Sequence, residues 1–462
     1  MQDIVADPLT LSQHRPLRLL TLCALYMAQG IPWGFVAITL AAWLAQQGLS
    51  AEDIAKVAVL SGLPWTFKWV WGPVIDRYGL LSMGRRRPWI LLAQLLMAAT
   101  LLAIVAIPDI TESVRLLAWM VFLHNVFNSL QDVSVDALAV DLLPEDERGK
   151  ANGLMFGSKY LGGAIGGAGM ATVLAHSGIR VALLVQVGVL SLIFLLPLLI
   201  RERPGERLLP WTRGQASPRA VEQGADSIRG VFADLLRAFS FRSSVLAAAL
   251  ALTMTTGAGL LAVVGVVFLV QELGWTDTEY ATLTGGWGLG CGLAGSILGG
   301  FVADRLGHRR TIATGCLVLA VLWVGFGLLE GSWTNRRFVT TVLLLDSFAI
   351  SLASVGFFAL AMGVSWPRVA ATQFTAYMAL SNLSQVTGGW LAGKLDGVVS
   401  VPHLYVGCGI FQALVVLILL GIDVGQVRRC LGDADGSAES LPRQQAPEGP
   451  GSAAEEGTST GG

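Results

Sequence analysis

Long apolar runs separated by clusters of charged residues recur along this chain. Runs of about 20 apolar residues are long enough to cross a bilayer as α-helices. The pattern predicts twelve spans, at residues 17–45, 54–76, 88–107, 115–143, 149–176, 178–200, 243–271, 279–303, 311–329, 338–363, 369–395 and 401–422. A polar stretch rich in Arg, Pro, Gly and Ser follows the sixth span. The sequence therefore predicts an all-α membrane protein whose twelve transmembrane helices form two six-helix bundles.

The same pattern divides the chain into five parts. These are an N-terminus at 1–16, a first bundle at 17–200, a central loop at 201–242, a second bundle at 243–422 and a disordered tail at 423–462. Basic residues are concentrated in the leading segment and the even-numbered loops, twelve against six in the odd-numbered loops. The positive-inside rule then places both termini and the central loop in the cytoplasm.

Composition narrows the functional class. Hydrophobic residues make up 53% of the chain, charged residues only 14%, and the mean hydropathy is +0.63, which argues against a soluble enzyme. The net charge of −1 gives no basic field for nucleic acid. The five cysteines are scattered, and the sequence has no Cys or His spacing typical of a zinc site, no nucleotide-binding P-loop and no hydrolase motif. We therefore expect no metal, no cofactor and no enzymatic activity.

One motif occurs in both predicted bundles, 228 residues apart. The first copy comprises Gly72, Asp76, Arg77 and Arg85, and the second comprises Gly300, Asp304, Arg305 and Arg309. An aspartate at the C-terminal end of a helix faces the negative end of the helix dipole and needs a compensating donor. Such a contact can hold one bundle against the other. A basic loop that serves topology alone would explain the arginines but not the aspartates.

The duplicated G-x-x-x-D-R-x-G-R-R pattern across a six-plus-six chain resembles the Major Facilitator Superfamily. That resemblance implies two bundles related by pseudo-two-fold symmetry and alternating access to a small-molecule substrate. It also implies that the duplicated residues form a cytoplasmic gate and do not bind substrate.

Four further segments resemble the peptide/acetyl-CoA transporter family, which includes AmpG-type muropeptide permeases. They are Leu25-Tyr-Met-Ala-Gln-Gly-Ile-Pro-Trp-Gly34, Leu63-Pro-Trp-Thr-Phe-Lys-Trp-Val-Trp-Gly-Pro73, Gln131-Asp-Val-Ser-Val-Asp-Ala137, and Ala371-Thr-Gln-Phe374 with Ser381-Asn-Leu383. The resemblance implies proton-coupled import of cell-wall muropeptides across a bacterial inner membrane, and we expect the protein to act as a monomer. Leu138-Ala139 stand where the bacterial branch often has Tyr-Arg, so an arginine contact after Asp136 is not expected.

Other functions remain open on the same fold. Acetyl-CoA, siderophores or other polar metabolites are alternative substrates, and drug export is an alternative direction. A membrane sensor or assembly protein that transports nothing is the competing class. Two copies of a gate motif argue against that class, since a receptor needs no such contact in both halves.

The fourth span carries a polar stripe of Asn125, Asn128, Asp132 and Asp136. At 100° per residue these side chains share one face, and charged groups at this depth usually mark transport pathways. Alternatively, fixed partners neutralise both acids. Lys159 matches the depth of Asp132, and Lys68 matches that of Asp136, so we predict these two ion pairs.

The second bundle has an acid for which we find no base at similar depth. Asp346 lies in the tenth span. An unpaired buried carboxylate takes up a proton readily, so we predict that Asp346 couples transport to protons. The alternative is an aspartate near the outer interface, reached by water or by Arg336 and Arg337.

Three further features complete the candidate site. Gln29 opens a Gln-Gly-Ile-Pro break in the first span, which is either a substrate site or an ordinary proline kink. Gln373, Tyr377 and Asn382 form a polar stripe on the eleventh span, suited to hydrogen-bonding a substrate. Asp141 lies near the cytoplasmic end of the fourth span, where we expect it to support the gate by pairing with Arg77.

Overall fold

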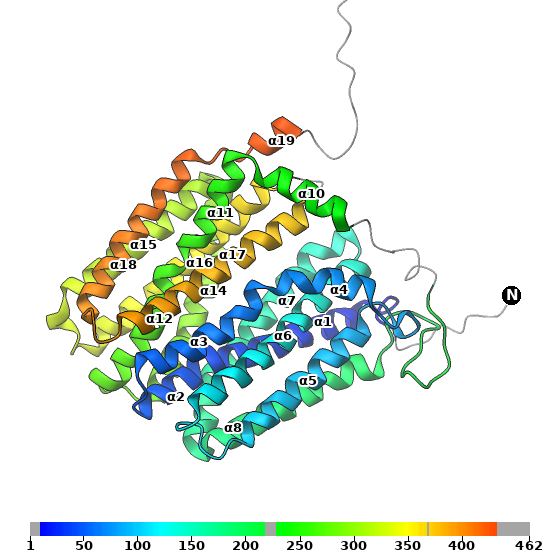
Figure 1. Cartoon of the computed structure of the whole chain (residues 1–462), viewed down its shortest axis with the longest axis horizontal. Helices are drawn as coiled ribbons and strands as arrows, with labels where there is room; N and C mark the ends of the chain where they lie inside the picture. The colour runs from blue at the N-terminus through cyan, green and yellow to red at the C-terminus, as the bar shows by residue number, and fades with distance from the viewer. Residues whose placement is uncertain (1–9, 218–227, 367–368, 432–462) are drawn as a thin grey trace, which may run out of the picture.

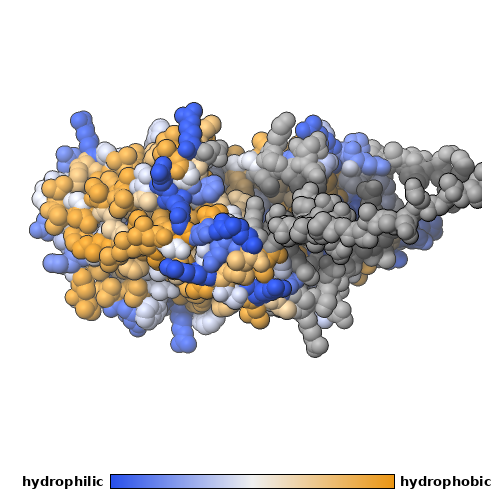
Figure 2. Space-filling model, turned by 90° about the horizontal axis from the view of Figure 1, so that it is seen from above, coloured by the Kyte–Doolittle hydropathy of each residue, from blue (hydrophilic) through white to orange (hydrophobic). Residues whose placement is uncertain are grey.

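The computed structural model describes residues 10–217, 228–366 and 369–431. The two halves of the chain form separate groups of helices, with the N-terminal helices below and the C-terminal helices above in Figure 1. Residues 1–9, 218–227 and 432–462, which belong to the predicted N-terminus, central loop and tail, lie outside the described part. Apolar residues cover much of the helical surface seen in Figure 2, as a bilayer requires.

The first half contains six passes, some of them interrupted. Its helices are α1 (Arg15–Gly34), α2 (Ala41–Gln46), α3 (Ala51–Thr66), α4 (Trp71–Arg77), α5 (Arg87–Val105), α6 (Val114–Leu142), α7 (Glu145–Ala164) and α8 (Met170–Leu199). A π-helical turn joins α1 to α2, and a 3-10 turn at Lys68–Val70 precedes α4. Gly178 has φ 79° inside α8, where the chain turns back, so α8 supplies parts of two passes.

The second half repeats this arrangement. Its helices are α10 (Ile228–Phe239), α11 (Arg242–Met254), α12 (Thr256–Val267), α13 (Asp277–Thr282), α14 (Leu289–Leu306), α15 (His308–Leu328), α16 (Arg336–Val364), α17 (Ala370–Leu395), α18 (Val401–Val415) and α19 (Gln426–Leu431). The passes agree with the predicted spans to within a few residues, and the all-α, two-bundle prediction is confirmed.

Hydropathy alone identifies fewer spans than the fold contains. Eight helical stretches of the described chain are long and apolar enough to cross a membrane, and one of them, Gly153–Leu199, contains the turn at Gly178. Helix α6 has 29 residues and α17 has 26, but neither is among the eight. Both carry polar side chains, and those side chains are the candidates for function.

The two halves touch most closely at one end of the helices. We call the end at which α1, α5, α11 and α15 begin the basic end, and the other the opposite end. Toward the opposite end, a Cβ added to Gly285 would lie 2.9 Å from the Cα of Gly167, and one added to Gly393 would lie 2.9 Å from the Cβ of Ala55. Gln271 Nε2 also donates to Ala45 O at 2.9 Å. These contacts join the halves there.

Nearer the basic end, three glycines of the helices that carry these contacts or flank them have open space around them. A Cβ added to Gly72, Gly157 or Gly300 would meet nothing within 4 Å among the described residues. Gly157 lies on α7, the helix that leads toward Gly167, and Gly300 lies on α14. Among these three glycines of the described chain, none has a close approach to the other half like those at Gly285 and Gly393.

Candidate functional site

The centre of the candidate site is Asp132 on α6, which lies between two lysines. Lys68 Nζ is 2.9 Å from Asp132 Oδ2, and Lys159 Nζ is 3.7 Å from Asp132 Oδ1. The predicted Lys159–Asp132 pair is therefore confirmed. The Asp132 side chain is only 4% exposed, whereas those of Lys68 and Lys159 are 16% and 30% exposed. One buried carboxylate thus holds two ammonium groups that keep part of their surface accessible.

An aromatic ring on α3 extends this cluster. Lys159 Nζ lies 5.2 Å from the centre of the Trp65 ring, and Lys68 Nζ lies 6.0 Å from it. Trp65 Nε1 donates to Asn125 Oδ1 at 3.0 Å, which fixes the plane of the indole. From the other half of the molecule, Asn382 Nδ2 donates to the Trp65 carbonyl at 3.2 Å. The cluster therefore lies where the two halves meet.

The predicted partner of Asp136 is wrong. Lys68 binds Asp132, and Asp136 instead accepts a hydrogen bond from the Tyr26 hydroxyl on α1. The reason is the break in the second pass. Helix α3 ends at Thr66 and Lys68 begins a 3-10 turn, so the direction of the Lys68 side chain cannot be derived by counting residues along one regular α-helix. Tyr26 also packs edge-on against Phe156, with ring centres 5.8 Å apart.

Asp346 has a different environment from Asp132. Trp323 Nε1 on α15 donates to Asp346 Oδ1 at 2.7 Å, and no ion pair to Asp346 is found among the described residues. Arg336, which we considered as a partner, binds Glu279 at 2.6 Å, and Arg337 is exposed. Asp346 thus lies inside the second half with a neutral indole as its hydrogen-bond donor.

Other predicted site residues lie away from the cluster. Gln373 and Tyr377 are fully buried and bond to each other at 3.0 Å, and Gln373 also donates to Ser244 Oγ on α11 at 3.3 Å. They hold α17 against α11 and present no surface to a substrate. Gln29 and Asn128 are also fully buried, within the first half. The predicted break at Gln-Gly-Ile-Pro is wrong, because α1 continues through Pro32 to Gly34 and the irregular π-helical turn begins only at Phe35.

The side chains of the gate residues Asp76, Arg77 and Asp304 lie outside the described set. Arg305 and Arg309 are exposed, and Arg85 is buried. Arg86 Nε lies 2.8 Å from Asp141 Oδ2, so Asp141 pairs with a base of the loop before α5, while its expected pair with Arg77 falls outside the described residues. The gating role of these residues remains a prediction.

The loop between α4 and α5 is tied to the chain that follows α8. Arg87 is 1% exposed, and its guanidinium donates to several carbonyls, including those of Leu198 at 2.9 Å and Arg207 at 3.1 Å. Glu202 accepts from the backbone N–H groups of Arg86 and Arg87 at 3.0 and 3.2 Å. The start of the central loop is therefore part of the folded first half.

One acid in this loop, Glu206, has a pKa well above its ordinary value. Burial, together with the nearby charge of Glu202, raises the pKa of Glu206 to about 8. Glu206 Oε2 accepts from the Arg203 backbone N–H at 2.9 Å, which opposes the shift in part. The carboxyl is therefore largely protonated at neutral pH.

Sequence reasoning did not include Tyr26 or Trp65 among the site residues. Tyr26 is three residues before Gln29, and Trp65 is three residues before Lys68, so each lies within one turn of a candidate. Aromatic residues are common in apolar spans, and this signal is too weak to separate a site residue from a packing residue.

Comparisons with known proteins agree with the two-bundle fold. The sequence profile described as Major Facilitator Superfamily matches residues 22–389 and 246–433. The chain is 25% identical over 376 residues to the "Anhydromuropeptide permease" of Escherichia coli (strain K12), covering 80% of this chain and 73% of that protein. It is 24% identical to the "Putative transporter AmpG 4" of Rickettsia conorii, covering 82% of this chain and 90% of that protein.

Solved structures share the fold. The nucleoside transporter NupG superposes with a TM-score of 0.64 and 12% identity, over 87% of this chain and 98% of that one. A D-xylose-proton symporter superposes with a TM-score of 0.65 and 14% identity, over 88% of this chain and 99% of that one.

Proposed function

Since the chain belongs to the Major Facilitator Superfamily, we propose that it is a proton-coupled importer of anhydro-muropeptides. The family makes it a membrane transporter of small molecules. The muropeptide is the finer part of the proposal, and it draws on the similarity to an anhydromuropeptide permease and on the chemistry at the interface between the halves.

The observation that carries the proposal is the placement of Lys159. Its ammonium lies between the Asp132 carboxylate and the Trp65 ring, and its side chain is 30% exposed at the interface between the halves. A ligand carboxylate can bind this ammonium, because its ion pair with Asp132 is long at 3.7 Å. The indole face offers a surface on which a sugar ring can stack. A sugar that carries a peptide supplies both groups.

Proton coupling is assigned to Asp346. A carboxylate without a cation inside a membrane bundle is costly when charged, so protonation stabilises it. The Trp323 indole bonds to either form, so the site tolerates loss and gain of the proton. We place the basic end in the cytoplasm, because basic residues are concentrated in the leading segment and the even-numbered loops. The close contacts of Gly285, Gly393 and Gln271 with the first half then lie toward the outer side.

Uptake into proteoliposomes tests this function. Labelled anhydro-muropeptide should accumulate when an inward proton gradient is imposed, and unlabelled acetyl-CoA should not compete. Lys159→Met should raise the KM for uptake, whereas Lys394→Met, a change outside the site, should leave it unaltered. Uptake that is the same with and without the proton gradient, or that acetyl-CoA blocks, would contradict the proposal.

A further inference from the structure

The first pass of each half ends in a similar way, at the opposite end of the helices. A glycine with positive φ turns the chain out of the pass, Gly48 at 82° in the first half and Gly274 at 66° in the second. A glutamine lies two or three residues before each glycine. These are Gln46, the last residue of α2, and Gln271, in the π-helical turn Phe268–Glu272. The two glutamines therefore occupy related places in the two halves.

The Gln271 side chain binds the turn of the first half. Its Nε2 donates to Ala45 O at 2.9 Å and to Leu49 O at 2.8 Å, which are carbonyls on either side of Gly48. Carbonyls only accept, so these partners fix the nitrogen of the Gln271 amide toward the first half. The turn is also closed within its own half, because Gly48 N–H donates to Ala45 O at 2.9 Å. Gln271 thus adds a link from the second half to a turn that is already ordered.

The Gln46 side chain makes the reverse contact. Its Oε1 accepts from the backbone N–H of Asp277 at 3.1 Å. Asp277 is the first residue of α13, and the first N–H groups of a helix have no acceptor within that helix. An N–H only donates, so the oxygen of the Gln46 amide faces the second half. Each half therefore contributes one glutamine side chain to backbone groups of the other.

The start of α13 is held in place by its own half. Thr276 and Glu279 form a reciprocal capping box, in which Thr276 Oγ1 accepts from the Glu279 N–H at 3.1 Å. Arg336, at the start of α16, donates to Glu279 Oε1 at 2.6 Å and lies 5.3 Å from the centre of the Trp275 ring. These contacts fix the position of the Asp277 N–H independently of the first half.

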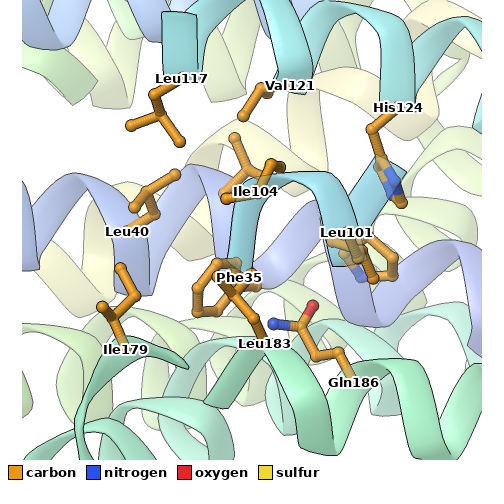
Figure 3. A pocket seen from close by; sticks show the side chains of 12 residues that line it. Phe35, Leu40, Leu101, Ile104, Leu117, Val121, His124, Ile179, Leu183 and Gln186 are labelled. Atoms are coloured by element: carbon orange, nitrogen blue, oxygen red, sulfur yellow. The ribbon is translucent and has the colours of Figure 1, made fainter. Parts of the chain in front are cut away.

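The end of the first pass is anchored in the first half in turn. Figure 3 shows Phe35 and Leu40, which begin and end a π-helical turn of this pass, beside apolar side chains of α5, α6 and α8. Both are 2% exposed. Helix α2 follows this turn directly, so the Gln46 side chain and the carbonyls beside Gly48 extend from a packed core.

The three bonds between the halves involve no charged group. Backbone groups and glutamine amides stay neutral at physiological pH. Gln46 and Gln271 are exposed, so water can replace their partners when the halves part. Each bond then has only the modest net strength of an ordinary intramolecular hydrogen bond. A link of this kind favours the joined arrangement and still opens readily.

We propose that Gln46 and Gln271 form a reciprocal clasp, which holds the two halves together at the opposite end and sets how often they part there. In a transporter whose halves separate at alternate ends, this clasp must open before a substrate can pass at that end. Loss of either glutamine destabilises the joined arrangement and leaves the separated one unaffected, because the clasp is already broken there. This inference concerns the contact between the halves and does not depend on the muropeptide or on proton coupling.

The distance between two spin labels, one in each half, measures how often the clasp is open. His176 and Glu330 are exposed residues at the opposite end, in the first and second half respectively. Both would be replaced by cysteine in the full chain, after the exposed Cys430 and the half-buried Cys23 and Cys291 are changed to alanine. Pulsed electron paramagnetic resonance in lipid nanodiscs then gives the ratio of longer to shorter distances, that is, of separated to joined halves.

Gln46→Met and Gln271→Met each remove hydrogen bonds of the clasp while keeping a side chain of similar length. Each should raise the ratio of separated to joined halves about two- to tenfold, as expected for the loss of an ordinary hydrogen bond. The double variant should raise it further, which makes the effect measurable even where the separated form of each single variant is rare.

Gln47→Met is the matched control. Gln47 is exposed and adjacent to Gln46, but its side chain makes no hydrogen bond among the described residues. This variant should leave the ratio of separated to joined halves unchanged. A double variant that keeps the distances of the unmodified protein would overturn the proposal, as would an equal rise of the ratio in Gln47→Met.

Discussion

Removing Lys68 should destabilise the protein far more than removing an exposed lysine. At the 2.9 Å separation of Lys68 and Asp132, the Coulomb attraction is about 6 kcal/mol with an effective dielectric constant of 20. Loss of one partner of a buried pair costs about 3–5 kcal/mol, because the other charge stays buried. Lys159 still attracts Asp132 from 3.7 Å, so we expect the lower end, about 3 kcal/mol, for Lys68→Met.

The matched control is Lys56→Met. Lys56 also lies 2.9 Å from an aspartate, Asp53, but its side chain is 51% exposed, so its loss should cost less than about 1 kcal/mol. The assay is denaturant unfolding in mixed micelles at pH 7, followed by tryptophan fluorescence. Adding Asp132→Asn to Lys68→Met should restore part of the loss, since no unpaired carboxylate then remains at that position. Equal destabilisation by Lys68→Met and Lys56→Met would refute this reasoning.

Three further outcomes follow from the structure. The free energy of unfolding should fall as the pH rises from about 4.5 to 8, because the raised pKa of Glu206 stabilises the folded state only while this carboxyl is protonated. Glu206→Gln should remove this pH dependence from the melting temperature measured across the same range. Arg87→Lys should lower the melting temperature sharply, since an ammonium cannot serve all the carbonyls that the guanidinium binds, whereas exposed Arg310→Lys should not. Trp65→Leu should raise the KM for muropeptide uptake about two- to tenfold, as expected for the loss of a stacking contact worth about 0.5–1.5 kcal/mol, and proton entry in the absence of muropeptide should be unchanged.

Much of the fold could be predicted from the sequence because the bilayer constrains it. Apolar runs bounded by charge clusters locate the passes, although α6 and α17 are too polar for hydropathy alone to identify them, and a constant rise per residue fixes the depth of each side chain. Depth was sufficient to pair Lys159 with Asp132. It was insufficient for Lys68, because the break after Thr66 changes the direction in which Lys68 points.

The contacts that the sequence did not predict depend on the rotation of one helix against another. Tyr26 reaches Asp136 from a helix 110 residues away in the chain. Gln373 and Tyr377 share a helix with Asn382, yet they face α11 while Asn382 faces the other half. Polarity on a span indicates that its side chains avoid lipid, but it does not distinguish a substrate pathway from a bond between helices.

The most direct test of the central claim is whether a muropeptide brings a proton with it. Proteoliposomes that contain the protein and a trapped pH-sensitive dye would receive anhydro-muropeptide under an inside-negative membrane potential. We predict acidification of the lumen that requires the muropeptide and is abolished in Asp346→Asn, while binding of the muropeptide to this variant persists. Accumulation of the muropeptide without acidification would contradict the account.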